Sequence, residues 1–352
     1  QNMKSIEDRK ILLVYNTCGI RRDNAQWYKE CIASFLNQDF DGLHVVVSSC
    51  MNSVECFKEL YSTFKDKISY CLYPDRYVVQ TTFNKTVIEM VKKYGEFEGY
   101  LYVDSGVTFD NQKNVIKEAY ERLKTNKYAI VTVQTDTDAA FNDLSGGYVG
   151  DEMIEDSPAA FSLWAKKRGG FAYETKFGDI QIRDEDFIVP PGASANLHAN
   201  IFSNELFKEY NNKILADVFK AYCLESTFIW MAKSVEKDWV IVKDLQVRHL
   251  KALDAPCAGF NTHSSTTGNY WDNLFGNRTA LEWMKDPEAI RAGLGYHNHP
   301  NVPLESRMQY SLDAFDENNK AKYPKDLAKI MKKYFFLNKE ELDYDEINFR
   351  LV

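Results

Sequence analysis

Two places in the sequence, one with a single aspartate and one with a pair, could hold a metal ion. Asp104 ends the apolar run Tyr-Leu-Tyr-Val at 100–103, and a carboxylate at the end of a strand can bind a divalent cation that bridges a diphosphate. The alternative is an aspartate that caps a turn. Asp136 and Asp138 form an Asp-x-Asp motif after the run 129–134. They offer a rival metal site, or else a solvated loop.

Two further side chains could move a proton or bind a metal. Glu225 lies in the mostly apolar stretch CLESTFIWM, where partial burial would keep a carboxylate reactive as a base. The alternative is a carboxylate on a helix surface without a catalytic role. His249 ends the segment DWVIVKDLQVRH. An imidazole at the end of a strand is either a ligand or a structural residue.

The elements that must position these residues alternate between strands and helices. Short apolar runs predict strands at 11–15, 43–47, 68–72, 100–103, 128–134 and 239–242. Apolar residues at steps of three and four predict helices at 25–37, 53–65, 81–93, 111–124, 205–213, 217–233, 277–285 and 325–336. This alternation is typical of an α/β fold with a mostly parallel sheet between helices. Ligands bind such sheets at the carboxyl ends of the strands, where Asn16, Ser48 and Asp104 stand.

The composition limits the classes of function. Of 352 residues, 45% are hydrophobic and 27% are charged, which predicts a globular chain. The net charge of −8 argues against non-specific binding of nucleic acid, although a local basic patch would still permit it. No apolar run approaches the roughly 20 residues that a membrane span needs. The seven cysteines include no Cys-x-x-Cys pair, which predicts reduced thiols and a cytoplasmic protein.

The order of these features resembles a family-2-type glycosyltransferase with the GT-A fold, over about residues 11–249. Leu36-Asn37-Gln38 stands where the family's first helix closes on Leu-x-Gln. Thr82-Phe83-Asn84-Lys85 stands where the family has Ala-Arg-Asn, before the metal-binding strand. Asp104 falls at the family's Asp-x-Asp strand, and the spacing from Glu225 to His249 fits the family's run of helix, turn, strand and histidine.

The resemblance implies a hexosyl- or pentosyltransferase that takes a nucleotide-diphosphate sugar, a UDP-sugar foremost. Asp104 and His249 would hold a divalent cation, Mn²⁺ or Mg²⁺. Glu225 would accept the proton of the attacking hydroxyl, with inversion at the sugar. The residues that the resemblance assigns to the donor are Tyr15, Asn16, Arg21, Ser48, Asn84, Asp104 and Ser105. Those that it assigns to the acceptor are Gly192, Ala193 and His198, in the segment 190–200.

The sequence departs from the family pattern at two positions. Gly106 replaces the second aspartate of the metal motif, and Ser48-Ser49-Cys50 replaces the aspartate that contacts ribose. Metal dependence and the identity of the nucleotide therefore stay open. The cation could be held by Asp104 and His249 with the phosphates alone. Residues that could assist it are Asp110, Asp136 and Asp138, and positive side chains that could replace it are Arg21, Arg22 and Lys85.

The resemblance predicts a glycosyltransferase domain over residues 1–250, with a donor half at 8–135 and an acceptor half at 136–250. Residues 251–352 are predicted to form a lid and a helical extension. A glycan or glycolipid is the leading acceptor, and the basic helix 325–336 could lie on an anionic membrane surface. One alternative is transfer to hydroxylated bases of DNA. Another is a protein that binds nucleotide sugars but has lost catalysis. A nucleotidyltransferase is disfavoured because no Gly-rich, Lys-bearing loop follows the first strand.

Overall fold

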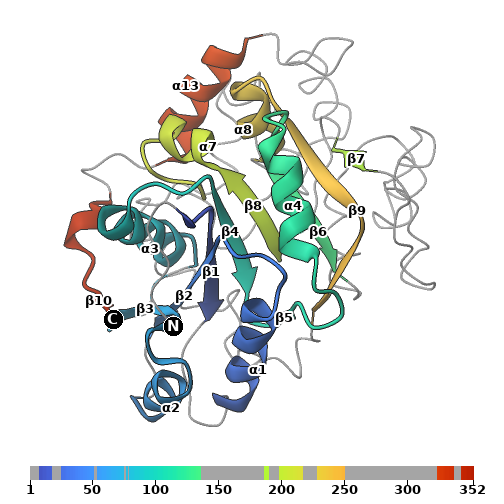
Figure 1. Ribbon diagram of the computed structural model, residues 1–352. Helices are drawn as coiled ribbons and strands as arrows, with labels where there is room; N and C mark the ends of the chain where they lie inside the picture. Colours follow the sequence, from blue (N-terminus) through green and yellow to red (C-terminus); the bar gives the residue numbers. More distant parts are fainter. Residues whose placement is uncertain are drawn as a thin grey trace, which may run out of the picture.

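The centre of the computed structural model is a sheet with helices on both faces (Figure 1). The structure describes residues 8–17, 25–50, 54–74, 77, 79–135, 186–189, 198–216, 228–249, 323–336 and 342–352. Within these residues the sheet has ten strands. Their order is β10 (Arg350–Leu351), β3 (Ser69–Tyr73), β2 (Leu43–Cys50), β1 (Ile11–Thr17), β4 (Gly99–Asp104), β8 (Ala199–Ser203), β6 (Tyr128–Thr135), β9 (Asp238–His249) and β5 (Val107–Thr108), and β7 (Phe187–Ile188) pairs with β9.

Most of the sheet is parallel. Strands β3, β2, β1 and β4 are parallel neighbours, and β9 is parallel to β6. Strand β8 lies between β4 and β6 and is antiparallel to both. The predicted α/β architecture is therefore confirmed, but β8 was not predicted. Its first residues, Ala199 and Asn200, belong to the segment 190–200 that was predicted to contact the acceptor.

The described helices largely follow the predicted ranges. They are α1 (Ala25–Leu36), α2 (Val54–Phe64), α3 (Val79–Tyr94), α4 (Val115–Lys124), α7 (Asn204–Glu209), α8 (Phe228–Ser234) and α13 (Pro324–Phe335). The helix predicted at 205–213 ends at Glu209 instead. Asn211 and Asn212 adopt φ values of 56° and 63°, and this left-handed conformation terminates a helix. The helix predicted at 277–285 lies outside the described residues.

Two hydrophobic clusters cover the two faces of the sheet. Along β1, Leu12 and Val14 belong to one cluster, which includes residues of α3, α7, α8 and α13. Ile11, Leu13 and Tyr15 alternate with them and join the other cluster, with α1, α2 and α4. Both faces of β1 are buried, and this explains why its sequence is a continuous apolar run.

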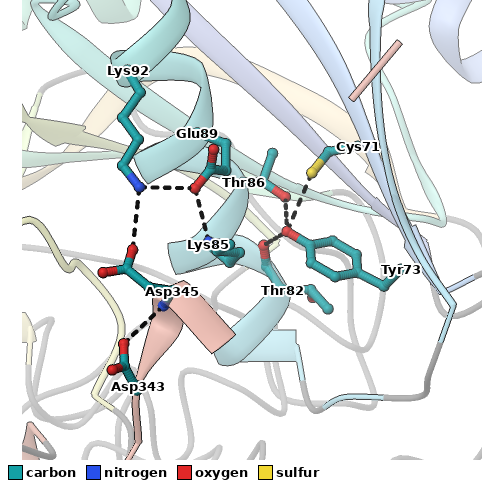
Figure 2. Close-up of polar contacts among 9 residues, drawn as sticks. All are labelled: Cys71, Tyr73, Thr82, Lys85, Thr86, Glu89, Lys92, Asp343 and Asp345. Carbon is teal, nitrogen blue, oxygen red and sulfur yellow. Dashed lines mark hydrogen bonds and ion pairs between the residues drawn. The ribbon is translucent and has the colours of Figure 1, made fainter. Parts of the chain in front are cut away.

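The C-terminal residues that the structure describes belong to the same core. Helix α13 packs against α8 (Figure 1), with Leu327 and Met331 buried. Residues 344–346 form a short 3-10 helix, and β10 pairs with β3. Lys92 of α3 forms an ion pair with Asp345 (Figure 2). The division at residue 250 stays a prediction, and the predicted lid lies outside the described residues.

The apolar side chains of α13 that the structure describes lie within this packing. Phe336 stacks on Tyr210 with ring centroids 4.8 Å apart, and Met331 Sδ accepts a 3.4 Å hydrogen bond from the Tyr210 hydroxyl. Lys332 pairs with Glu209. In the part of the helix whose side chains the structure describes, Leu327, Ala328 and Met331 are buried, and Lys325 and Lys329 are exposed. In the described part of the chain, no helix is long and apolar enough to cross a bilayer.

Candidate functional site

Three polar residues form a row across the carboxyl ends of β2, β1 and β4. Asn16 lies opposite Ser48 on β2 and opposite Asp104 on β4. Val14 and Tyr102, two residues before Asn16 and Asp104, face the α3 side of the sheet. Side chains alternate along a strand, so the row faces that side as well. All three residues were predicted at this edge.

Asp104 is held by two side chains and by the adjacent strand. One carboxylate oxygen, Oδ2, lies 2.5 Å from Nδ1 of His198. The other, Oδ1, accepts a 2.7 Å hydrogen bond from the Tyr102 hydroxyl. The backbone N–H of Asp104 donates to the carbonyl of His198, where β8 begins opposite Val103. The side chains are 29% exposed for Asp104 and 14% for His198, so both are partly accessible to solvent.

The Asn16 amide has one satisfied end and one unsatisfied end. Its Nδ2 donates to the carbonyls of Val14 and Val103, at 3.0 and 3.2 Å. Its Oδ1 is buried, and no donor among the described residues reaches it. A buried acceptor without a partner costs about 1–3 kcal/mol. The amide oxygen is therefore suited to a hydrogen bond from a ligand at the strand ends.

Tyr15 fixes the turn that follows Asp104. Its hydroxyl donates a 2.6 Å hydrogen bond to the carbonyl of Ser105, and Trp27 Nε1 donates to the same oxygen at 3.1 Å. The Tyr15 side chain is fully buried on the α1 face, against Tyr28. Burial raises its pKa well above the ordinary value, so the phenol stays neutral. These contacts give Tyr15 and the Ser105 carbonyl a positioning role at the turn, where the sequence analysis expected donor contacts.

Ser48 joins a buried network of hydroxyl groups. Its Oγ accepts a 2.9 Å hydrogen bond from Thr86 of α3. The Tyr73 hydroxyl lies 2.8 Å from Thr86 Oγ1, donates to the carbonyl of Thr82 and accepts from the Cys71 thiol (Figure 2). Ser48 itself is 1% exposed. The network fastens β2 and β3 to α3, so Ser48 helps to fix this edge of the sheet.

Asn84 uses all its hydrogen-bonding positions inside the protein. Its Nδ2 donates to the carbonyl of Leu215 and to the Tyr344 hydroxyl, at 2.8 and 3.0 Å. Its Oδ1 accepts from the backbone N–H groups of Ile214 and Leu215, both at 3.0 Å. The predicted contact with the donor is not supported by this geometry, because an amide has two donor and two acceptor positions.

Two of the residues considered as alternatives to the usual metal motif also have partners. Lys85 is 1% exposed, donates to Glu89 at 2.8 Å (Figure 2) and lies 4.8 Å from the ring of Phe349. Asp110 accepts from Thr108 and forms a 3.1 Å ion pair with Arg248. These contacts favour structural roles for both side chains over the handling of a diphosphate.

His249 reaches the same edge of the sheet through its backbone. In the pairing of β5 with β9, Val107 lies opposite His249, and β5 directly follows the turn at 105–106. The end of β9 therefore lies beside the loop that leaves Asp104. The other predicted residues lie outside the described part of the chain: Arg21, Arg22, Asp136, Asp138, Gly192, Ala193 and Glu225. Their roles remain predictions.

The contacts of His198 and Tyr102 with Asp104 were not predicted. Tyr102 precedes Asp104 by two residues, so the two-residue period of a strand could have placed both on one face. His198 was assigned to the acceptor, and only the recognition of 199–203 as an antiparallel strand beside β4 would have brought it to Asp104. In the described ranges, no group of three or more His, Cys, Asp or Glu side chains forms a metal site.

Comparisons with known proteins return structural likenesses only. No protein-family model matches the chain, and no curated protein sequence matches it. The mannosyltransferase PcManGT from Pyrobaculum calidifontis, in complex with GDP-Man and Mn²⁺, shares 9% identity at a TM-score of 0.47, covering 92% of this chain and 74% of its own. S. aureus TarS 1–349 shares 12% identity, and 13% in complex with UDP, at TM-scores of 0.42, with 92% of this chain and 91% of TarS covered. TM-scores below 0.5 do not establish a shared fold, and these likenesses assign no function to the chain.

Proposed function

We propose that this chain is a glycosyltransferase that binds a nucleotide-diphosphate sugar, foremost a UDP-sugar, at the carboxyl ends of β1, β2 and β4. The observation that carries the proposal is the in-register row of Ser48, Asn16 and Asp104, with the end of β9 beside the next turn. Ligands of parallel α/β sheets bind at this edge. Asp104 and His249 are also among the residues that carry the sequence resemblance to family-2-type glycosyltransferases of the GT-A fold, whereas Ser48 stands where the sequence departs from that pattern.

Asn16 and the turn after Asp104 would orient the donor. The buried Oδ1 of Asn16 would accept a hydrogen bond from an N–H or O–H of the nucleoside. Tyr15 and Trp27 hold the Ser105 carbonyl between them. The turn would thus keep one conformation when the donor binds, which lowers the entropy lost on binding.

A divalent cation fits the residues present at this edge. The Asp104 carboxylate is part exposed, and oxygen donors suit Mn²⁺ and Mg²⁺. Asp104 and His249 are the residues that would hold it. When bound, the ion would offset the charge of the diphosphate leaving group. Tyr102 would keep the carboxylate in its orientation through the hydrogen bond to Oδ1.

Glu225 is the proposed base. It would accept the proton of the acceptor hydroxyl while that oxygen attacks the sugar from the side opposite the leaving group, which predicts inversion. Gly192 and Ala193 would contact the acceptor, foremost a glycan or glycolipid. DNA with hydroxylated bases is the second acceptor class, for which a local basic patch would be needed because the net charge is −8.

The experiment follows nucleotide release from UDP-, GDP- and dTDP-sugars, with and without Mn²⁺. Glu225→Gln is expected to abolish sugar hydrolysis or transfer and to retain donor binding. Glu121→Gln on α4 serves as the matched control, because Glu121 is 47% exposed and pairs only with Lys124 among the described contacts. If the wild type and both variants all bind the donor but none of them turns it over, the chain is instead a nucleotide-sugar-binding protein that has lost catalysis. Absence of donor binding in the wild type would overturn the proposal.

A further inference from the structure

We infer that His198 is a further protein ligand of the proposed cation site, beside Asp104 and His249, and occupies the role left by Gly106. This inference rests on the proposed function, because it concerns the ion that would accompany the donor diphosphate. The sequence analysis assigned His198 to the acceptor. The structure instead brings its Nδ1 to 2.5 Å from Oδ2 of Asp104.

The backbones of both residues are fixed by the sheet. Val103 pairs with Ala199 in the antiparallel register of β4 and β8, and the N–H of Asp104 donates to the carbonyl of His198 at 3.1 Å. The two side chains therefore start from neighbouring positions on adjacent strands. Their approach does not depend on a loop that closes over the site.

The separation of the two atoms is close to that of two ligands of one cation. Metal–ligand distances of about 2.1 Å place two cis ligands of an octahedral ion roughly 3 Å apart. The observed separation of Nδ1 and Oδ2 is 2.5 Å. A change of about half an ångström in this separation would let both atoms face one ion. The hydrogen bond between them would be exchanged for two bonds to the metal, and the proton that they share would move to Nε2 of His198 or to solvent.

Tyr102 supplies an outer contact that supports this arrangement. Its hydroxyl occupies Oδ1 of Asp104 at 2.7 Å and so leaves Oδ2 as the oxygen that faces His198. Hydrogen bonds of this kind orient metal-binding carboxylates, and their loss typically weakens metal affinity about 10–100-fold. The carboxylate is thus prepared to bind through one oxygen.

Asp104 and His198 together predict which ion is preferred and how its binding depends on the nucleotide. An imidazole nitrogen favours Mn²⁺ and later transition metals over Mg²⁺, which prefers oxygen ligands. Asp104 contributes one negative charge, and Gly106 contributes no ligand side chain. So few protein ligands would hold Mn²⁺ weakly by themselves, and phosphate oxygens of the nucleotide would complete the coordination. Mn²⁺ and nucleotide are therefore expected to bind cooperatively.

The first experiment measures free Mn²⁺ by electron paramagnetic resonance during titration of the protein with and without UDP or GDP. His198→Gln, which cannot supply an imidazole ligand, should weaken Mn²⁺ binding in the nucleotide complex at least tenfold. His198→Asp returns a carboxylate ligand and should restore most of that affinity. Asp66→Asn is the matched control, since Asp66 is an exposed carboxylate in the 3-10 helix Lys65–Lys67. It should bind Mn²⁺ as the wild type does.

A second measurement keeps His198 in place. In His249→Gln, the Mn²⁺–nucleotide complex should still show ¹⁴N modulation of the electron spin echo, and the added His198→Gln change should remove it. Wild-type Mn²⁺ affinity in His198→Gln, or no ¹⁴N modulation in His249→Gln, would overturn the inference and identify the contact with Asp104 as an ion pair or hydrogen bond only. Wild-type protein that binds nucleotide without any effect of Mn²⁺ would also overturn it and leave the proposed function standing. Failure to bind any nucleotide would instead contradict the proposed function.

Discussion

Asn84 and Tyr344 lie 260 positions apart in the chain and are joined by a 3.0 Å hydrogen bond from the amide to the hydroxyl. Asn84 stands in α3, two positions before Thr86, which donates to Ser48 at the carboxyl end of β2. The described C-terminal segment therefore supports the helix that lies behind the candidate donor site. The contribution of this C-terminal segment to stability can be measured by unfolding, independently of donor binding.

Tyr344→Phe should lower the free energy of unfolding by about 1–3 kcal/mol, because it leaves a buried N–H of Asn84 without its acceptor. Equilibrium unfolding in urea measures the change. Tyr323→Phe is the matched control, since Tyr323 is 64% exposed, and it should change stability by less than about 0.5 kcal/mol. Equal effects of the two substitutions would show that the contact between Asn84 and Tyr344 contributes nothing measurable.

His44 predicts a dependence of stability on pH. Burial, together with the charges of Arg9 and Lys93, lowers its pKa from 6.5 to about 3. At a pH between these two pKa values, His44 would be protonated in the unfolded chain and neutral in the folded protein. Stability from the neutral imidazole is therefore complete above about pH 6.5 and declines as the pH falls toward 3, with a slope of at most about 1.4 kcal/mol per pH unit.

Urea unfolding of the wild type and of His44→Gln between pH 7 and pH 5 tests this dependence. The variant keeps a polar group that can contact Ser69, the 2.9 Å partner of His44 Nε2. The wild type should lose more stability than the variant over this interval, which lies above the ordinary pKa values of carboxylates. Parallel pH profiles would contradict the lowered pKa of His44.

The sequence could predict which residues lie at the strand ends, but not the side-chain contacts between segments far apart in the chain. Asn16, Ser48 and Asp104 were predicted at one edge because each follows an apolar run, and parallel strands bring such ends together. The approach of His198 to Asp104 depends on β8, whose five residues follow a segment rich in proline and glycine. The bond between Asn84 and Tyr344 depends on tertiary packing alone. Neither leaves a local periodic signal in the chain.

Asn16→Ala should weaken binding of the nucleotide at least severalfold, because it removes the buried Oδ1 that no described donor reaches. Isothermal titration with UDP and GDP measures this loss. Thr17→Val is the matched control on the other face of β1, where the hydroxyl donates to the carbonyl of Ser48. It should keep the affinity of the wild type. Loss of stability in Asn16→Ala with unchanged nucleotide affinity would assign Asn16 a structural role only.

Met331 tests whether the apolar face of α13 belongs to the core or to a membrane-binding surface. Its side chain is fully buried and contacts the hydroxyl of Tyr210. Met331→Ala should therefore lower the free energy of unfolding by about 2–4 kcal/mol through loss of packing. Lys329→Ala, at an exposed position of the same helix, should leave stability within about 0.5 kcal/mol of the wild type.

Flotation with anionic vesicles distinguishes the two interpretations of this helix. If α13 stays packed on α8, any binding should depend on its exposed lysines and disappear at high salt, because screening weakens surface electrostatics. Met331→Ala should then bind vesicles as the wild type does, under conditions where both proteins are folded. Wild-type stability of Met331→Ala combined with loss of vesicle binding would show that this face leaves the core and enters the membrane interface.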